Sequence, residues 1–506
     1  MENREFKSGC GIDFGTTNSV AAIGSVNITN PEINRTLPLT KKGDGLPHPS
    51  VVWLRLNDPP IVGRDAKDNI NGFSEVAGNY FVSSIKGQLG KEKVFHIFGQ
   101  PKTAVQIAGE IFKFLKIDAE KSHSQDISEG VVTIPINFDG KSRRELRKAA
   151  DEAGFYIKNF IHEPFAALAG FCYGSDSKDR IDKLEGRKIL VFDWGGGTLD
   201  ITVATVKDGI LTELSTSGLP GRAGDSFDNK LLNLTTNRFL NQNRLSPLDC
   251  EMAPNVKDRY LKLCEDSKIE LSGNEETLVI VTNAFQTQSQ NFSVKERVSR
   301  EEFEREINAD VKEAMKQVDT ALEHAGINST EIDLALLIGG TSNIPIIRLE
   351  MEERFGYRLE EVSNPDTIIA EGASIIDALE LQPALARSIG IQLSDDSYYE
   401  VFSAGTIAKA ASVPKQINMF CTDNRDGQAR LIIKERKNKD SNEGEKTLAV
   451  LPVPVMSKLK PHFPEKVTVS FSLDEDLVLQ VIGKGATQDI NSHIELHNLC
   501  FGLRTL

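Results

Sequence analysis

The stretch Val191–Asp200 constrains the fold of this chain most strongly, because it places three consecutive glycines between two predicted strands, 188–193 and 201–206. Glycines at such a turn let the backbone approach a bulky ligand and leave N–H groups free to bind it. Asp193 and Asp200 flank the glycines, and their carboxylates would repel a bare phosphate unless a cation lay between them. The stretch therefore predicts a site for a magnesium-bound nucleotide. A simple glycine-rich hairpin turn is the alternative, but it explains the glycines and not both acids.

A second stretch, Gly11–Ser19, repeats this order of residues. Asp13 precedes Gly15, two threonines follow, and a strand is predicted directly after them. Two similar phosphate-binding hairpins indicate a duplicated unit in which each copy supplies one side of a nucleotide clamp. Coincidence between two short glycine turns is the alternative, and it is disfavoured because the aspartate and the threonine both recur in register.

Strands and helices alternate between these hairpins. Buried strands are predicted over 131–135 and 157–161, and a helix over 141–153 lies between them. Either Asp139 or Ser142 can cap that helix. Strand, helix and strand at this spacing predict an α/β fold.

Further motifs follow the same layout. Glu163 directly precedes a helix that begins at Pro164. Ser299 and Glu302 have the spacing of a capping box, which predicts the start of a long helix. A third glycine turn at Gly339 follows a buried strand, at the end of a strand where α/β proteins usually bind ligands.

The pattern changes after about residue 380, where helical periodicity gives way to short alternating strands. These strands are predicted over 389–393, 398–402, 416–420 and 429–434, and the clearest hairpin pairs 467–473 with 477–481. The charged run 435–446 is predicted to be a solvated loop. This part of the chain therefore predicts a small β domain.

Bulk properties exclude several classes of protein. The net charge is −14 and no long basic tract occurs, which argues against nucleic acid or an anionic membrane as a partner. No run of 18 apolar residues is present, and the six cysteines form no CxxC pair, so we expect no transmembrane helix, zinc site or disulfide framework. The polar start is too short for a signal peptide, and we expect a cytoplasmic protein.

Taken together, these segments resemble the seventy-kilodalton heat-shock (DnaK-type) chaperone family, part of the actin-like ATPase superfamily. The resemblance is strong over residues 9–380 and weak over 387–506. The matching stretches are Gly11–Ser19, Ser84–Lys86, Val131–Pro135, Glu163-Pro164, Asp193–Asp200, Gly224–Asn229 and Gly339–Pro345. Sugar kinases and actins share the two hairpins, but the other stretches and a β domain are not expected in them.

The resemblance implies an α/β, actin-like ATPase fold of two duplicated lobes, followed by a small antiparallel β-sandwich. The expected domains are a nucleotide-binding domain over 1–380, a linker over 381–387, and a truncated substrate-binding-like β domain over 388–506 without a helical lid. Without a lid, a captured peptide is expected to leave quickly.

The family also implies roles for individual residues. The catalytic group would be Lys86, Glu163, Asp193 and Thr198. The nucleotide would be bound by Gly15, Thr16, Thr17, Asn18, Gly195, Gly196, Gly197, Glu265, Lys268, Ser272, Gly339, Gly340, Thr341, Asn343 and Asp366. Mg²⁺ would be held through water by Asp13, Asp193 and Asp200, and Pro135 and Arg143 would relay changes to the β domain. From its own window, Lys86 is more simply read as a solvated lysine, and only the resemblance reverses that interpretation.

The chain also departs from the family pattern. Asn343 replaces an arginine that stacks on adenine, and Ile269 stands where some members have a second, which could weaken nucleotide binding by about 1 kcal/mol. Asn159, His162 and Phe165 alter the surface that receives J-domain co-chaperones. The linker run 380–386 lacks the family's acidic, leucine-rich character.

The resemblance leads to two functional hypotheses. The first is an ATP-dependent, chaperone-like protein that slowly hydrolyses ATP and so controls binding of extended polypeptide segments. ATP or ADP, Mg²⁺ and, as a further candidate, K⁺ would be its cofactors, and a J-domain protein and a nucleotide-exchange factor are candidate partners. The alternative is a regulatory or scaffolding homologue that binds ATP with little turnover and serves one dedicated partner. In the β domain, Phe420 and Ile433 are candidates for a peptide groove, although a core position is the simpler interpretation of each.

Overall fold

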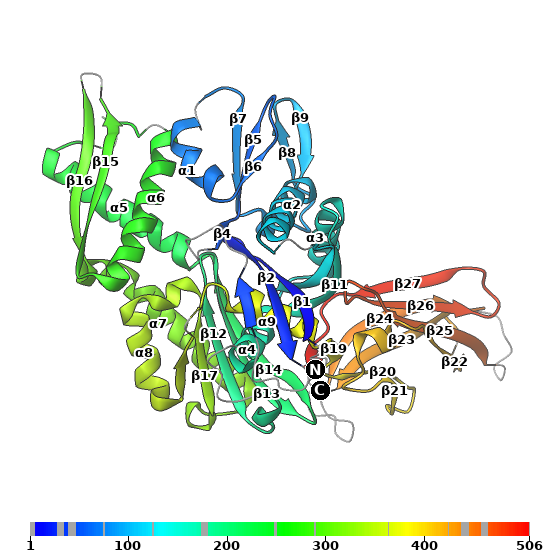
Figure 1. Ribbon diagram of the computed structural model, residues 1–506. Helices are drawn as coiled ribbons and strands as arrows, with labels where there is room; N and C mark the ends of the chain where they lie inside the picture. The colour runs from blue at the N-terminus through cyan, green and yellow to red at the C-terminus, as the bar shows by residue number, and fades with distance from the viewer. Residues whose placement is uncertain are drawn as a thin grey trace, which may run out of the picture.

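Two large sheets, each containing one of the two glycine hairpins, form the centre of the structure (Figure 1). The computed structural model describes residues 6–27, 35–38, 47–73, 76–123, 126–173, 181–246, 250–252, 254–287, 290–362, 364–423, 425–436, 445–456 and 464–504. The first sheet has the strand order β11-β10-β1-β2-β3, with β4 also paired to β2. Its strands are β1 (Phe6–Phe14), β2 (Asn18–Asn27), β3 (Arg35–Pro38), β4 (His48–Pro49), β10 (Glu129–Ile134) and β11 (Tyr156–His162).

Parallel pairing in the first sheet depends on helical connections. β10 runs parallel to both β1 and β11, and parallel neighbours need a crossover between them. Helices α2 (Ala104–His123) and α3 (Gly140–Glu152) lie in these connections. The Asp139 carboxylate accepts a 2.8 Å hydrogen bond from the Ser142 backbone N–H, so Asp139 is the cap of α3.

The second sheet has the order β18-β17-β12-β13-β14-β28-β19. Its strands are β12 (Lys188–Trp194), β13 (Thr198–Lys207), β14 (Ile210–Pro220), β17 (Leu334–Ile338), β18 (Leu359–Glu361), β19 (Gln382–Leu385) and β28 (Phe501–Arg504). All five residues of β17 are buried, which agrees with its continuous apolar run.

Two helices separate the large sheets. α4 (Glu163–Tyr173) and α9 (Ile368–Ala378) pack against each other; α9 also contacts β1 and β2, and α4 contacts β10 and β12. Figure 1 shows this pair at the centre of the molecule. The arrangement brings the turn ends of the two glycine hairpins toward each other.

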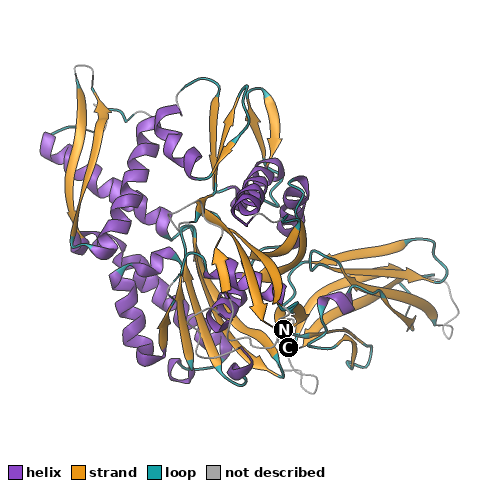
Figure 2. Cartoon of the chain, viewed as in Figure 1, coloured by secondary structure: helices purple, strands orange, loops and turns teal. Residues whose placement is uncertain are grey.

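The remaining elements of the α/β part flank the sheets, as Figure 2 shows. The helices are α1 (Arg64–Phe73), α5 (Gly224–Asn243), α6 (Pro254–Gly273), α7 (Arg300–Ala325) and α8 (Pro345–Phe355). The strands are β5 (Val51–Arg55), β6 (Ile61–Val62), β7 (Asn79–Ser83), β8 (Val94–Ile97), β9 (Gln100–Thr103), β15 (Glu276–Gln286) and β16 (Asn291–Ser299). The predicted capping box of Ser299 and Glu302 opens α7.

Residues 388–496, called the β part below, form two four-stranded antiparallel sheets, β21-β20-β23-β24 and β22-β25-β26-β27, and the short helix α10 (Ala408–Ala411). The strands are β20 (Ser388–Gln392), β21 (Tyr398–Phe402), β22 (Lys415–Cys421), β23 (Gln428–Arg436), β24 (Lys446–Pro454), β25 (Glu465–Leu473), β26 (Leu479–Gly485) and β27 (Asn491–Leu496). Side chains from both sheets share one apolar cluster, which continues to residues of the first large sheet and α2.

One expectation for the β part is wrong. Glu435 was assigned to a solvated charged loop, but it is buried at the end of β23, where it forms a 2.9 Å ion pair with Arg387. Lys446 begins β24, and residues 437–444 of the predicted loop lie outside the described residues. A local run of charges did not reveal a partner that precedes it by 48 residues.

The mixed α/β class predicted from the sequence is confirmed. The boundaries at 380 and 388 stay predictions, and β28, which falls in the expected β domain, pairs with β14 and β19 of the second sheet. Within the described residues, no helix is both long and apolar enough to span a membrane.

Glu213 on β14 gives the fold a pH dependence. Burial raises the pKa of its carboxyl from 4.5 to about 7, against the opposing effects of Thr216 and Arg387. The folded protein thus favours the protonated form, so the stabilising contribution is full below about pH 4.5 and is lost as the pH rises through about 7.

We therefore expect Glu213→Gln, which fixes the neutral state, to resist unfolding better than the wild type at pH 8 and similarly at pH 5. Urea unfolding midpoints of the two proteins, measured across that pH range, test this expectation. A difference that does not change with pH would contradict it.

Candidate functional site

The turns of the two glycine hairpins touch each other. A Cβ atom added to Gly196 would lie 2.3 Å from Thr17 Oγ1, and one added to Gly197 would lie 3.4 Å from Thr16 Cγ2. Only glycine permits the first of these approaches. The structure therefore brings together the two stretches that the sequence predicts to grip one nucleotide.

Acidic side chains gather behind these turns. Asp13 is the next-to-last residue of β1, and Glu163 is the first residue of α4. Asp193 and Asp200 lie opposite each other where β12 pairs with β13. Lys86, on the 3₁₀ turn η1 (Ile85–Gln88), forms a 2.7 Å ion pair with Glu163 and is only 5 % exposed. The interpretation of Lys86 as a solvated lysine is therefore wrong.

The pKa values record how closely these groups interact. Burial, followed by the charge of Glu163, raises the pKa of Asp13 and of Asp200 to about 6, and the same two causes raise the pKa of Asp193. Burial opposes the charge on Lys86, but Glu163 and Asp13 outweigh it, so the pKa of Lys86 is raised. Four carboxylates thus face one lysine, and this excess of negative charge on oxygen donors suits a hard cation such as Mg²⁺.

Neighbouring hydroxyl groups orient two of the carboxylates. Thr133 on β10 donates a 2.9 Å hydrogen bond to Asp13, and Thr198 donates a 2.7 Å hydrogen bond to Asp200. Among the described residues, no three His, Cys, Asp or Glu side chains converge closely enough to bind an ion directly. Coordination of Mg²⁺ through water therefore stays a prediction.

The third glycine turn contacts the second hairpin. Gly339 has φ +81°, and a Cβ atom there would lie 2.6 Å from Asp193 Oδ1. On the following 3₁₀ turn, η4 (Gly340–Asn343), the Thr341 hydroxyl donates a 2.8 Å hydrogen bond to the Gly195 carbonyl. The turn thus extends the candidate site from the two glycine hairpins toward α6.

Several of the residues predicted to bind the nucleoside converge there. A Cβ atom on Gly224 would lie 2.8 Å from Thr341 Oγ1 and 3.1 Å from Lys268 Nζ, and one on Gly340 would lie 3.2 Å from Asp366 Oδ1. Lys268 also forms a 2.8 Å ion pair with Asp228. These contacts group the third turn with the start of α5 and the second half of α6.

Other predicted residues have different contacts. Glu265 on α6 forms a 2.6 Å ion pair with Lys67 of α1, which links two helices far apart in the sequence. The Ser272 hydroxyl donates to the Lys268 carbonyl of its own helix at 3.4 Å. Asn18 begins β2 opposite Pro49, and Asn343 ends η4.

Three residues that contact the predicted site residues could not be identified from the sequence: Thr133, Asp228 and Phe138. Thr133 and Asp228 lie in stretches that carried the resemblance, but their types alone gave no reason to assign them a role. No sequence pattern pointed to Phe138, because its role depends on residues that contact it only in the folded structure. The Lys86 ammonium lies 5.9 Å from the centre of its ring, and its backbone carbonyl accepts a hydrogen bond from Arg143.

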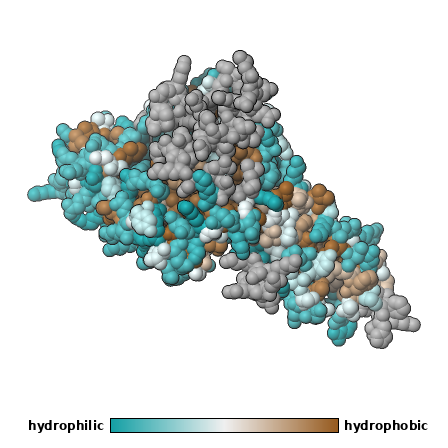
Figure 3. Space-filling view, turned by 60° about the horizontal axis from the view of Figure 1, so that its bottom comes forward, coloured by the Kyte–Doolittle hydropathy of each residue, from teal (hydrophilic) through white to brown (hydrophobic). Residues whose placement is uncertain are grey.

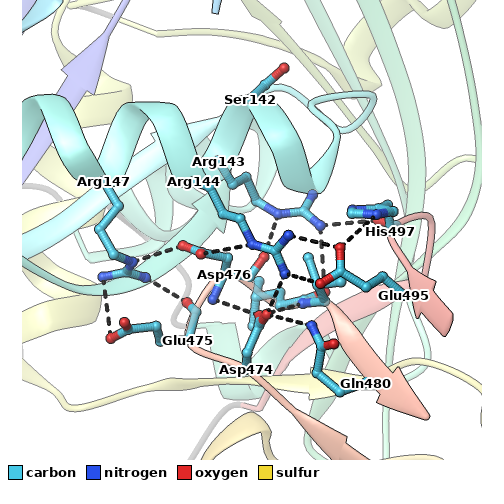
Figure 4. A network of polar contacts seen from close by, with 12 residues as sticks. Ser142, Arg143, Arg144, Arg147, Asp474, Glu475, Asp476, Gln480, Glu495 and His497 are labelled. Atoms are coloured by element: carbon cyan, nitrogen blue, oxygen red, sulfur yellow. Dashed lines mark hydrogen bonds and ion pairs between the residues drawn. The ribbon is translucent and has the colours of Figure 1, made fainter. Parts of the chain in front are cut away.

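Arg143 continues from this point to the β part (Figure 4). Its guanidinium donates to the carbonyl of Asp476 at 2.6 Å and to that of His497 at 3.0 Å. Pro135, the other predicted relay residue, accepts a 3.0 Å hydrogen bond from the Phe138 N–H. A chain of direct contacts therefore runs from Lys86 through Phe138 and Arg143 to the turn between β25 and β26.

Two more arginines of α3 hold the same turn, as Figure 4 shows. Arg147 forms a 2.8 Å ion pair with the buried Asp476 carboxylate. Arg144 binds Asp474 at 2.9 Å and Glu495 at 2.8 Å. The contact between α3 and this turn therefore consists of ion pairs whose side chains are largely removed from water.

We expect Asp476→Asn to lower the free energy of unfolding by about 3 kcal/mol, because it leaves the buried Arg147 with only its longer, 4.0 Å ion pair to the exposed Glu475. Urea unfolding at neutral pH measures the change. Asp489→Asn is a matched control, because its exposed pair with Lys484 lies in the same part of the chain and is expected to contribute little. Equal midpoints for the two variants would contradict the prediction.

Comparisons with known proteins agree with this geometry. The family model described as Hsp70 protein matches residues 60–500. The curated relatives include the chaperone protein DnaK of two strains of Halobacterium salinarum, R1 and NRC-1, each 26 % identical over 491 residues, which cover 93 % of this chain and 72 % of the relative. Because the family model matches most of its length, the chain belongs to the Hsp70 family.

Proposed function

We propose that this protein is an ATP-dependent chaperone that binds and slowly hydrolyses ATP to control its grip on extended polypeptide segments. Members of the Hsp70 family are ATPases that depend on nucleotide and Mg²⁺. The observation that carries the proposal is the cluster of four carboxylates and Lys86 where the two glycine turns meet. The actin-like two-lobed fold, the β-sandwich and the domain boundaries expected from the sequence are part of the same proposal.

Binding of the nucleotide is assigned to the three glycine turns. Backbone N–H groups of the turns at 15–18 and 195–197 would receive the phosphates. Lys268, Thr341 and Asp366, which lie around Gly224 and Gly340, would contact the nucleoside, together with Glu265 and Ser272 of α6. Bound Mg²⁺ would neutralise phosphate charge, and Asp13, Asp193 and Asp200 would hold it through water.

Hydrolysis of ATP needs positioning and charge neutralisation more than covalent chemistry. Lys86 would point its ammonium at the transferred phosphoryl group, since it already lies among the carboxylates that surround that position. Glu163, within 2.7 Å of Lys86, would accept a hydrogen bond from the attacking water. Thr198 would hold the neighbouring Asp200 in place through its 2.7 Å hydrogen bond.

The β part is proposed to bind the client. Its exposed large apolar side chains include Val413, Phe420, Val450, Ile482 and Ile490, and Figure 3 shows apolar residues over the β part, on the right of that face. An extended segment can pair with a strand edge and place alternate side chains on such a surface. Phe420, which is 62 % exposed, stays a candidate for contact with a peptide, whereas Ile433 is fully buried and belongs to the core.

Burial weakens one argument for the scaffold alternative, in which ATP is a structural ligand: the predicted change of the J-domain-binding surface. Two of the three positions that depart from the J-domain-binding surface, His162 and Phe165, are only 6 % and 3 % exposed. Burial keeps those two side chains from a partner in this conformation. Coupling to a J-domain protein or an exchange factor, a role for K⁺, and a cytoplasmic location all stay predictions.

We expect Lys86→Ala to bind Mg-ATP as the wild type does but to lose on the order of 100-fold or more in single-turnover hydrolysis, because the positioned ammonium is gone. Calorimetry measures the binding, and quenched single-turnover reactions measure the hydrolysis. Lys91→Ala, an exposed lysine on the same segment, is the control and should retain both.

Unchanged hydrolysis in Lys86→Ala would overturn the catalytic assignment. A wild-type protein that binds ATP without turnover, and whose affinity for one partner depends on ATP, would support the scaffold instead. No heat of ATP binding in magnesium buffer would overturn both.

A further inference from the structure

Strand β28 lies between the α/β part and the linker, where no element was expected. One edge of β28 pairs with β14, in the register Ile210 with Arg504 and Leu211 with Leu503. Its other edge pairs with β19 along its whole length, from Gln382 to Leu385. In Figure 1 this red strand lies beside β19, near both marked ends of the chain. Among the described strands, β19 therefore reaches the second sheet through β28 and does not pair with β14 itself.

The side chains of β28 are anchored in two different cores. Leu503 is fully buried in the cluster that contains Leu211 and Leu381, between the two large sheets. Phe501 is 4 % exposed and belongs to the cluster that contains Ile389 and the rest of the β part. Residues two apart on a strand point to the same face. One face of a four-residue strand thus joins both cores.

Gly502, between these two anchors, fits tightly against β14. A Cβ atom there would lie 2.5 Å from the Leu211 carbonyl oxygen, 3.0 Å from Thr212 Cγ2 and 3.2 Å from Ile210 Cγ2. The first neighbour is backbone and cannot rotate away, so a larger residue would push β28 off β14. Pairing of β28 with β14 therefore requires glycine at position 502.

Backbone hydrogen bonds continue on both sides of β28. β14 pairs with β13, which begins at Thr198 of the second glycine hairpin. On the other side, the Leu385 N–H donates to the Thr406 carbonyl at 2.9 Å, and the Gly405 N–H donates to the Leu385 carbonyl at 2.7 Å. A continuous ladder thus runs from the phosphate hairpin through β14, β28 and β19 into the β part.

We propose that β28 acts as a splint, that is, a structural bridge between the two parts of the molecule. Its pairing with β14 holds the linker and the β part in place. The same pairing carries movements of the β13–β14 hairpin to the β part. The holding role goes beyond the proposed function and does not depend on it. The transmission of nucleotide-dependent movement rests on the proposed function. The arginine contacts of α3 are a separate connection, which the loss of β28 leaves intact.

Gly502→Val tests the splint, since it forces β28 away from β14. We expect the Leu385, Ala386 and Gly405 amides, which donate within or beside the ladder, to exchange hydrogen at least tenfold faster than in the wild type. Gly72→Val is the control, because a Cβ atom at Gly72 meets no atom within 4 Å. Unchanged exchange at these three amides would overturn the proposal.

A reversible lock covers the case in which Gly502→Val fails to fold. Ile210 and Arg504 are register partners, so cysteines at both positions are close enough for a disulfide. In a Cys500→Ser background, which removes the adjacent thiol, we expect oxidation to slow exchange at the same amides at least tenfold relative to the reduced form. Equal exchange in both forms would overturn the splint.

Calorimetry with Mg-ATP on the same proteins separates this proposal from the proposed function. If no protein binds ATP, the proposed function fails, but the exchange data still test the splint. If ATP binds and changes exchange at Leu385 in the wild type and in the oxidised form, but not in Gly502→Val, the transmission role is supported. If ATP binds and leaves exchange at Leu385 unchanged in the oxidised form, or changes it equally in Gly502→Val, β28 does not carry the movement.

Discussion

The close approach of two glycine turns is the constraint on which the site depends. Gly196 has no room for a side chain against Thr17, so the hairpins of the two sheets meet backbone against side chain. Their meeting draws Asp13, Asp193 and Asp200 into one buried group, whose raised pKa values show the cost of keeping them charged. In the function that we propose, a bound cation would relieve that cost, because its charge would offset both the carboxylates and the phosphates. The same packing that builds the fold therefore creates a site that favours a cation.

Lys86 connects this group to the rest of the molecule. It is held by Glu163 and lies over the ring of Phe138, whose carbonyl binds Arg143 of α3. A shift of the ammonium toward a phosphate would thus be felt at the residues that hold the β25–β26 turn. Two physically different connections reach the β part: charged side chains of α3, which bind the β25–β26 turn, and the backbone ladder through β28. Each connection begins near one of the two glycine hairpins, so both could respond to the nucleotide that we propose.

Much of the fold was predictable where the signal is local. The caps of α3 and α7, the buried run of β17 and the alternating strands of β25 and β26 follow from spacing and side-chain type alone. The two hairpins were predictable because an aspartate, glycines and a threonine recur in one order. What local patterns could not give were partners distant in the sequence. Glu435 appeared to belong to a solvated loop and is buried against Arg387, while Lys86 appeared solvated and is buried against Glu163.

The sequence by itself determined the α/β class, the two hairpins and the resemblance to one family, because short-range spacing and turn chemistry are written directly in the order of residues. Only the tertiary structure decided that Phe138 joins Lys86 to Arg143, that Asp228 faces Lys268, and that Phe501–Arg504 lies between β14 and β19. The reason is physical: a strand of four residues carries too little pattern to name its neighbours. Once the larger elements have packed, one sheet edge and two apolar cores remain open to it. These decide where the strand lies.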